Sequence, residues 1–297
     1  MDLRKAWPKG TPIPLTLTLT VRDLLERDLW STNDWKTCRI QELDWTFTLS
    51  ATVKQSGPKG VSLEAVLDAV KGTWKDQSPD DPARPEVDLA FPVEGAKPGP
   101  WVQVFAGLKG AKLLLEFGPS GGVTRVQGWA AASAKALGPL LEDPKTKALA
   151  KDLSAWFSDT AWTALLDAAL PACIPVAGAK STRGSPFPWT QDFGEPRLPA
   201  VPLEFKVEPG AEGTSVAAAF ESGKVDQALR FPGQPGFHSL GTAQKGELRA
   251  DYAPDGLRHG KVFWEVDDRW DNYRPSAKAD RFERKVSFTL DVALPAS

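Results

Sequence analysis

The feature that most constrains the fold is a strict alternation of apolar and polar residues in four segments. Residues 15–21, 43–50, 247–252 and 285–292 each place apolar side chains on one face and threonine, serine or charged side chains on the other. Strands that are apolar on one face only are typical of antiparallel sheets with one solvated face, whereas strands of parallel sheets are apolar on both. The alternation predicts an antiparallel sheet and disfavours a doubly wound fold.

A hairpin pattern that occurs twice predicts how this sheet is divided. Residues 113–129 and 248–264 each run from an apolar strand through a Pro-Ser or Pro-Asp turn with glycine to a return strand containing tryptophan. Proline presets φ in such turns and glycine accepts a positive φ. The duplication predicts two related, half-barrel-like parts: residues 1–178 with a helical insert, and a second β-rich half at 179–297. One sheet continuous through both parts is the open alternative.

A sheet with one apolar face needs a second layer to cover it. The segment between residues 100 and 170 predicts that layer as two or three short amphipathic helices. One begins at Pro100, one at Asp143-Pro144, and one at Asp159 or Thr160, the last of these being stopped by Pro171. The predicted fold class is therefore α+β, a curved, mostly antiparallel sheet with short helices on one face.

Other segments are less regular. Residues 61–71 fit a strand and a helix, and the strand is favoured because the neighbouring segments are strands. Residues 76–86, 178–202 and 231–246 are rich in proline, glycine or small polar residues and are predicted to be long connections.

Composition excludes several classes of function. With 36 basic and 38 acidic residues and no basic stripe, nucleic acid is not expected as a partner. No apolar run is long enough to be a transmembrane segment. We expect a periplasmic or other extracytoplasmic location if a signal peptide has been removed, and a cytoplasmic one otherwise. The two cysteines, Cys38 and Cys173, allow inert thiols or one disulfide but no site of paired thiolates, so no metal and no cofactor are predicted.

Gly118-Pro-Ser120-Gly-Gly122 matches the G-x-S-x-G pattern of serine hydrolases. A nucleophile elbow needs a helix directly after the serine and a nearby base. The residues after Gly122 instead indicate a return strand, and the only histidines, His238 and His259, stand in no catalytic pattern. The segment is interpreted as a turn, and the protein is predicted not to be an enzyme.

The densest polar and aromatic segment, residues 264–274, has three interpretations. Its acids and asparagine at 267, 268, 271 and 272 supply oxygen ligands for calcium, although their spacing is not that of a calcium loop. Trp270 and Tyr273 are suited to stack on a sugar or a protein partner. The third interpretation is a strand end with a packed tryptophan and solvated charges.

A set of short motifs supports a distant resemblance: Leu113–Phe117, Gly122–Gly128, Leu170-Pro171, Ile174–Val176, Trp189 and Gly246–Tyr252. With these, the sequence resembles a bacterial family of exported, β-rich proteins classified only as a domain of unknown function. The segment Arg22–Arg39 departs from that family's opening. The pattern is also loosely similar to the half-barrels that carry lipoproteins or lipids in bacterial envelopes. The resemblance implies an exported, β-rich fold with helices over an apolar groove.

The sequence predicts a non-enzymatic binding or scaffold protein of the bacterial cell envelope that holds a lipid, another apolar ligand or a protein partner. An apolar groove between a curved sheet and its helices binds apolar groups. The candidate ligand-binding residues are Trp45, Phe47, Leu115, Phe117, Trp264, Trp270 and Tyr273. The alternative is glycan or cell-wall binding through exposed tryptophans, and a serine hydrolase is the remote alternative. The oligomeric state is not predicted.

Overall fold

The computed structural model describes residues 9–29, 32–81, 86–92, 99–119, 122–170, 178, 180–183, 201–210, 213–225, 237–253, 256–273 and 279–294. Only the backbone is described for residues 181–183, 223–225, 237–242, 256–257, 268, 270–273 and 279.

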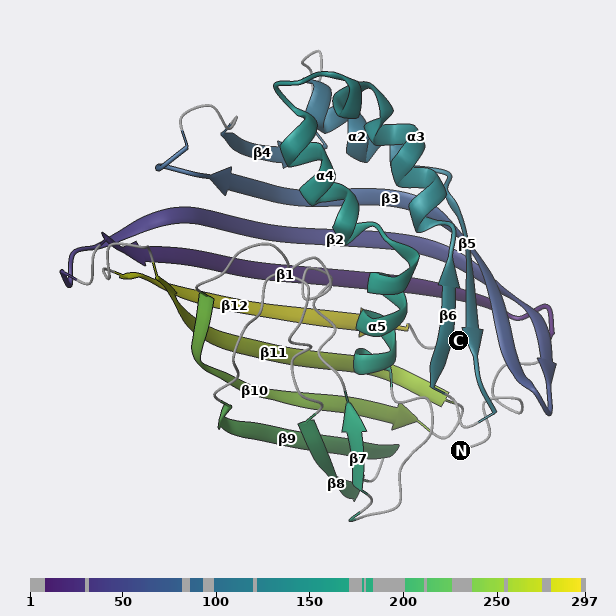
Figure 1. The fold of residues 1–297 in the computed structure, drawn as a ribbon. Coiled ribbons are helices and arrows are strands. Elements are labelled where there is room, and N and C mark those ends of the chain that lie inside the picture. The colour runs from purple at the N-terminus through teal and green to yellow at the C-terminus, as the bar shows by residue number, and fades with distance from the viewer. Residues whose placement is uncertain are drawn as a thin grey trace.

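One curved, antiparallel sheet contains every strand of the described residues (Figure 1). Its strands are β1 (Pro12–Asp28), β2 (Trp35–Gly57), β3 (Gly60–Gln77), β4 (Val87–Phe91), β5 (Lys112–Phe117), β6 (Val123–Gln127), β7 (Lys180–Arg183), β8 (Val201–Gly210), β9 (Gly213–Val225), β10 (Phe237–Ala253), β11 (Gly256–Tyr273) and β12 (Ala279–Ala293). They lie in the order β6-β5-β3-β2-β1-β12-β11-β10-β9-β8-β7. Outside this order, β4 pairs with the C-terminal half of β3. The predicted α+β class with a curved antiparallel sheet is confirmed.

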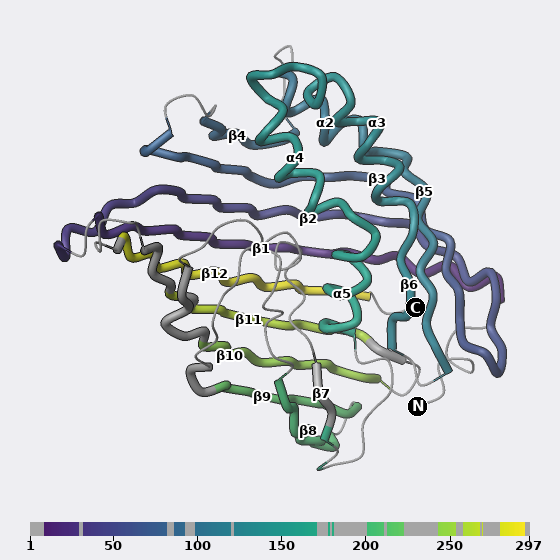
Figure 2. The backbone as a smooth tube through the Cα atoms, in the orientation of Figure 1, coloured from purple at the N-terminus to yellow at the C-terminus, as the bar shows by residue number. Residues whose placement is uncertain are grey.

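The middle of the sheet joins the two ends of the chain. β1 pairs with β2 on one side and with β12 on the other. Figure 2 shows this pairing as the purple N-terminal strand beside the yellow C-terminal strand. Strands β1–β5 and β10–β12 therefore belong to one sheet, and the division into parts at residue 178 stays a prediction.

Four helices of the described residues lie on one side of the sheet, which we call the inner face (Figure 1). They are α2 (Pro100–Leu108), α3 (Trp129–Glu142), α4 (Lys147–Trp156) and α5 (Asp159–Ala169). α5 begins where the sequence predicts, because the Ser158 side chain accepts a hydrogen bond from the Ala161 N–H. α2 also begins at the predicted Pro100.

Strand alternation sets the two faces. Along β1, Leu15, Leu17, Leu19 and Val21 are buried, while the threonines between them are partly exposed. Their Cα partners on β12 and β2 alternate in the same way, so the apolar rows continue across strands. The buried apolar residues of sheet and helices belong to one core cluster, which extends as far as Phe205 and Val216 on β8 and β9.

Helix α5 connects the curled edge of the sheet to its middle. Its side chains accept hydrogen bonds from edge strand β6: Asp167 Oδ1 from the Val123 N–H at 3.0 Å and Thr163 Oγ1 from the Val126 N–H at 2.9 Å. The same helix also contacts β10, β11 and β12. α5 thus satisfies backbone donors that an edge strand would otherwise leave unpaired.

Three expectations need correction. Helix α3 was not expected: Gly128, with φ of 106°, ends the hairpin in a left-handed conformation, and Trp129 begins a helix instead of closing the return strand. Helix α4 begins at Lys147, because Asp143 is the C-cap of α3. Residues 237–246 of the expected connection 231–246 belong to β10, and residues 180–183 of the connection 178–202 form β7.

Residues 61–71 form part of β3, so the predicted strand is confirmed. Both predicted hairpins are confirmed as well, as β5–β6 and β10–β11.

We predict that Gly260→Ala destabilises the protein by about 1–3 kcal/mol, because the added Cβ would lie 2.4 Å from the Ala169 carbonyl oxygen where α5 packs on β11. Gly138→Ala is the control: it lies in α3, where the added Cβ would meet no other element within 4 Å. We expect little change in stability, because the usual gain of alanine over glycine in a helix is offset by the following Pro139. Urea unfolding measures both. Equal stability of the two variants would contradict the close packing of α5 on β11.

Candidate functional site

The helices cover the inner face through a cluster of aromatic rings. The Trp45 ring stacks on Phe157 with 5.3 Å between centroids and 8° between planes. The Phe47 ring meets Trp129 and Trp162 edge-on, at 5.3 Å in each case. The members of this aromatic cluster are Trp45, Phe47, Trp74, Phe91, Trp101, Phe105, Trp129, Phe157 and Trp162. The predicted residues Trp45 and Phe47 are thus packed beneath helices, with 0% of each side chain exposed.

The other predicted residues are distributed over the same face. Leu115 and Phe117 lie on β5 opposite β3 and are buried. Trp264 lies on β11, two strands beyond β1, and its ring packs on Phe220 at 4.4 Å. All three belong to the same core cluster as Trp45. The side chains of Trp270 and Tyr273 lie outside the described residues. Their backbone belongs to β11, and the choice among the three interpretations of this segment stays a prediction.

The buried indole N–H groups differ in whether they have a hydrogen-bond acceptor. Trp264 Nε1 donates a hydrogen bond to Gln244 Oε1 at 3.1 Å. The Nε1 atoms of Trp45, Trp74 and Trp162 are buried and have no hydrogen-bond partner. A buried donor without an acceptor costs about 1–3 kcal/mol, and buried tryptophans usually find a partner. Three such donors therefore lie within one aromatic cluster.

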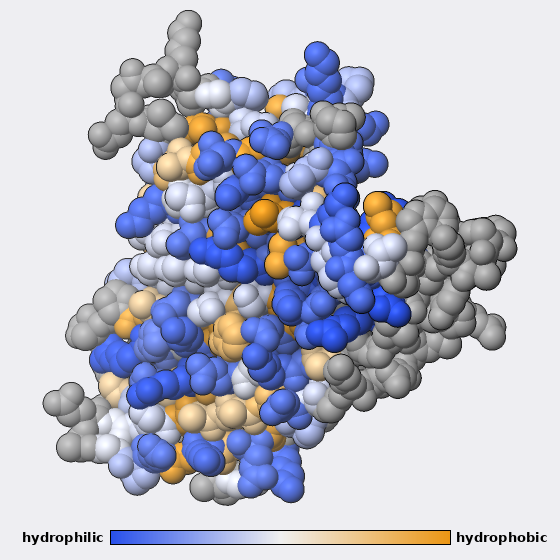
Figure 3. All heavy atoms as spheres, turned by 90° about the vertical axis from the view of Figure 1, so that its left-hand side faces the viewer, coloured by the Kyte–Doolittle hydropathy of each residue, from blue (hydrophilic) through white to orange (hydrophobic). Residues whose placement is uncertain are grey.

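Toward one end of the strands, the inward-facing residues of the sheet change from apolar to polar. Beyond the apolar residues Val21, Leu43 and Trp74, the next inward positions are Asp23, Gln41 and Asp76, which are register partners on adjacent strands and are each buried. Figure 3 views this end of the sheet, where the surface is mostly hydrophilic with some hydrophobic residues between. The apolar part of the inner face therefore ends at a defined row.

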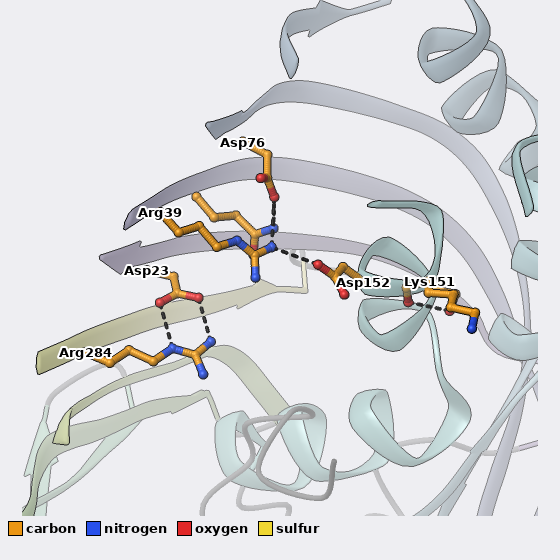
Figure 4. A network of polar contacts seen from close by, with 8 residues as sticks. Asp23, Arg39, Asp76, Lys151, Asp152 and Arg284 are labelled. Carbon is orange, nitrogen blue, oxygen red and sulfur yellow. Dashed lines mark hydrogen bonds and ion pairs between the residues drawn. The ribbon is translucent and has the colours of Figure 1, made fainter. Parts of the chain in front are cut away.

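Two arginines neutralise the buried carboxylates of this polar end (Figure 4). Arg284 pairs with Asp23 through two hydrogen bonds, Nε–Oδ1 at 2.9 Å and Nη2–Oδ2 at 2.7 Å. Arg39 Nη2 donates to Asp76 Oδ2 at 2.9 Å and to Asp152 Oδ2 at 3.2 Å. Removing one partner of such a buried pair costs about 3–5 kcal/mol.

Asp152 gives this network a second role, because it belongs to α4 and not to the sheet. Its side chain is 39% exposed, whereas Asp76 is fully buried. Figure 4 shows the Arg39 side chain between the two carboxylates. The Arg39–Asp152 pair therefore fastens the helical layer to the sheet where the apolar face ends.

Sequence reasoning missed this network, although a signal was present. The alternation that identifies the strands continues with polar residues at inward positions: Asp23 two residues after Val21, and Arg284 two residues before Val286. A polar residue that continues an apolar alternation indicates a buried polar position. Only the register shows that these positions lie on adjacent strands.

The motifs considered for catalysis have structural explanations. Gly118–Gly122 connects β5 to β6, which pair as antiparallel strands, so the expected return strand is confirmed; Ser120 itself lies outside the described residues. His259 Nε2 lies 2.9 Å from Asp291 Oδ1, and Ser215 Oγ donates to Asp251 Oδ1 at 2.6 Å. In a serine hydrolase, an imidazole base contacts the serine hydroxyl and activates it. The Ser215 hydroxyl contacts the Asp251 carboxylate instead, so it is not activated in this way.

Cys38 is a free, half-buried thiol, and Cys173 lies outside the described residues. The Cys38 Sγ lies 3.0 Å from Asp80 Oδ2. Burial first, and then this hydrogen bond and the negative charge of Asp80, raise the pKa of the Cys38 thiol from 9.0 to about 12. The thiol is therefore held in its unreactive, protonated form at neutral pH.

Other classes of site receive little support within the described residues. Among the tryptophans whose side chains the structure describes, Trp35 is the exposed one, at 39%, and glycan binding through exposed tryptophans stays a prediction. No group of three histidine, cysteine or acidic side chains in the described ranges could hold a metal ion. No helix among them has the length and apolar character needed to cross a membrane.

Comparisons with known proteins identify no family. No model of a protein family and no curated protein matches the sequence. A solved structure titled "Lipid-protein interactions in lipovitellin" matches with a TM-score of 0.41 and 8% identity over 98% of this chain and 25% of that chain. The outer membrane protein OprG from Pseudomonas aeruginosa matches with a TM-score of 0.24 and 5% identity over 97% of both chains.

The chain spans about a quarter of the lipovitellin chain. At these TM-scores neither likeness carries an argument about function. The resemblance to an exported bacterial family stays a prediction, and what the fold defines is an α+β protein with one curved antiparallel sheet and an aromatic contact between sheet and helices.

We predict that Trp264→Phe lowers the free energy of unfolding by about 1 kcal/mol more than Trp162→Phe does. Both changes remove the same ring volume from a buried position, but only the first removes a hydrogen bond. Urea unfolding with unchanged m-values is the measurement. Equal losses would show that the Trp162 N–H has an acceptor in solution.

We predict that alkylation of Cys38 by iodoacetamide continues to accelerate from pH 8 to above pH 10, because the raised pKa keeps the thiolate scarce over that range. At pH 8 its thiolate fraction is about three orders of magnitude below that of a thiol with the ordinary pKa of 9.0. Asp80→Ala should raise the rate at pH 8. Peptide mass spectrometry separates Cys38 from Cys173, and a plateau of the Cys38 rate near pH 9 would refute the raised pKa.

Proposed function

We propose that this protein is a non-enzymatic binding protein that holds an apolar ligand between the inner face of its sheet and helices α2–α5. The observation that carries the proposal is the aromatic cluster, in which three buried indole N–H groups lack an acceptor. Each buried donor without an acceptor costs free energy, so three of them in one cluster need an explanation, and an acceptor on a ligand supplies one. Its place in a bacterial envelope is part of the proposal and rests on the sequence resemblance.

The arrangement of the helical layer supports this function. The helices are contiguous in sequence apart from the β5–β6 hairpin, and they meet the sheet mainly through rings. Ring contacts are adaptable because they are not directional in the way that hydrogen bonds are. A ligand can therefore enter if the layer moves outward and replace ring contacts by its own apolar surface.

The polar end of the inner face supports a place of entry for the ligand. Arg39 and Asp152 fasten α4 at the row where the apolar surface stops. Their pair is partly exposed, so water and salt weaken it. We propose that α4 separates from the sheet at this pair when the ligand enters.

Native mass spectrometry of protein purified without detergent tests the function directly. We expect an additional apolar mass that is released by collisional activation and recovered by solvent extraction. Protein freed of that mass should then bind the apolar fluorophore N-phenyl-1-naphthylamine. If neither the mass nor the fluorophore is found, the ligand proposal is wrong and the alternative, a scaffold for a protein partner, takes its place.

A pair of variants tests the route. Asp152→Asn should accelerate fluorophore uptake by about twofold to fivefold, because it weakens the partly exposed pair with Arg39. Glu42→Gln is the matched control, since Glu42 forms an exposed pair with Arg22, which connects β1 and β2 but no helix. Equal rates in the two variants would exclude entry beside α4.

A further inference from the structure

We infer that the indole N–H groups of Trp45, Trp74 and Trp162 are the hydrogen-bond donors of the ligand site, and that the ligand is an uncharged long-chain acyl ester. This inference rests on the proposed function and identifies the class of ligand. Each of the three side chains is at most 1% exposed, and none of the Nε1 atoms has a partner.

The three donors belong to one continuous set of ring contacts. Phe105 contacts both Trp45 and Trp74, with centroids 5.4 and 6.3 Å apart. Phe47 contacts both Trp45 and Trp162, at 6.2 and 5.3 Å. The three indoles therefore lie in one contiguous cluster, with phenylalanine rings between them.

Trp264 provides an internal comparison. It lies on the same inner face, is 1% exposed, and its Nε1 donates to Gln244. On the part of the inner face outside the aromatic cluster, the buried indole N–H of Trp264 thus has an acceptor. Among the described residues, the buried indole N–H groups without a partner are those of Trp45, Trp74 and Trp162, all in the aromatic cluster.

The chemistry of the donors selects the ligand. Indole offers a donor and no acceptor. A ligand that satisfies it must bring acceptor oxygens, and an alcohol or an amide would also bring a donor that itself needs an acceptor. An ester has acceptor oxygens only, and its acyl chain matches the apolar surroundings.

The charges nearby disfavour a free fatty acid. Asp76 follows Trp74 at the next inward position of β3. In the network of Figure 4, three carboxylates face two arginines, with Asp152 as the third acid. Both guanidinium groups thus already pair with carboxylates, so a carboxylate ligand would be buried without a counter-ion, whereas a neutral ester needs none.

Binding of methyl palmitate, hexadecane and palmitate, each delivered from cyclodextrin to ligand-free protein, tests the inference. We expect methyl palmitate to bind at least about tenfold more tightly than hexadecane, because hexadecane leaves the donors unpaired. Palmitate should bind more weakly than its ester. Equal affinities for the ester and the alkane would overturn the ester assignment and leave the proposed function standing, whereas no binding of any probe would overturn both.

Replacing each donor alone locates the site. Trp45→Phe, Trp74→Phe and Trp162→Phe keep an aromatic ring and remove the N–H. The variant that lacks the N–H donating to the ester should bind methyl palmitate about threefold to tenfold more weakly, and all three should change hexadecane binding little. Trp35→Phe, at the exposed end of β2, is the control and should change neither. Equal losses for both probes in the cluster variants would contradict a donor role.

Indole N–H resonances of the unaltered protein give a second readout that does not depend on variant folding. With ¹⁵N-labelled tryptophan, the signal of at least one of the three indoles should move downfield when methyl palmitate is added and should stay in place with hexadecane. Identical shifts with both probes would overturn the inference.

Discussion

The fold is stable only while the apolar face of its sheet is covered. The alternation of apolar and polar residues along the strands necessarily creates this apolar face. The inward residues of β1, β2 and β12 form continuous apolar rows, and each buried leucine or phenylalanine contributes about 1.5–3 kcal/mol only while water is kept away. Helices α2–α5 exclude that water on one part of the face through aromatic rings. The hydrogen bonds from β6 to α5 and the ion pair from Arg39 to α4 position this layer.

The same contact is the reason we propose that the helical layer is the functional part of the fold. Strands of the central sheet are joined to both neighbours by backbone hydrogen bonds, whereas the helices meet the sheet mostly through side chains. Loss of the layer would leave the backbone ladder intact and expose the aromatic cluster. Adjacent to that cluster, the row of Asp23, Gln41 and Asp76 limits the apolar surface. An apolar ligand with a neutral polar group fits such a surface.

The fold followed from the sequence because its signals are local. Alternation in residues 15–21 and 43–50 identified strands and their inward faces, and Pro100 and Asp159 marked helix starts. Helix α3 was missed because Gly138 and Pro139 weaken its helical pattern. The candidate site was predicted less well: Trp45 and Phe47 were identified as inward residues, but contacts between strands and helices far apart in sequence, such as that of Arg39 with Asp152, depend on register and packing. Whether an indole N–H is paired likewise follows only from the folded geometry.

Hydrogen–deuterium exchange of the ligand-free protein tests most directly the claim that the helical layer is separable from the sheet. The account predicts that amides of α2–α4 exchange through a shared opening of lower free energy than that of β1, β2 and β12, whose pairing does not involve the helices. It further predicts that a bound apolar ligand slows exchange in the helices more than in these strands. Exchange of helices and central strands through one common global unfolding, with or without ligand, would contradict it.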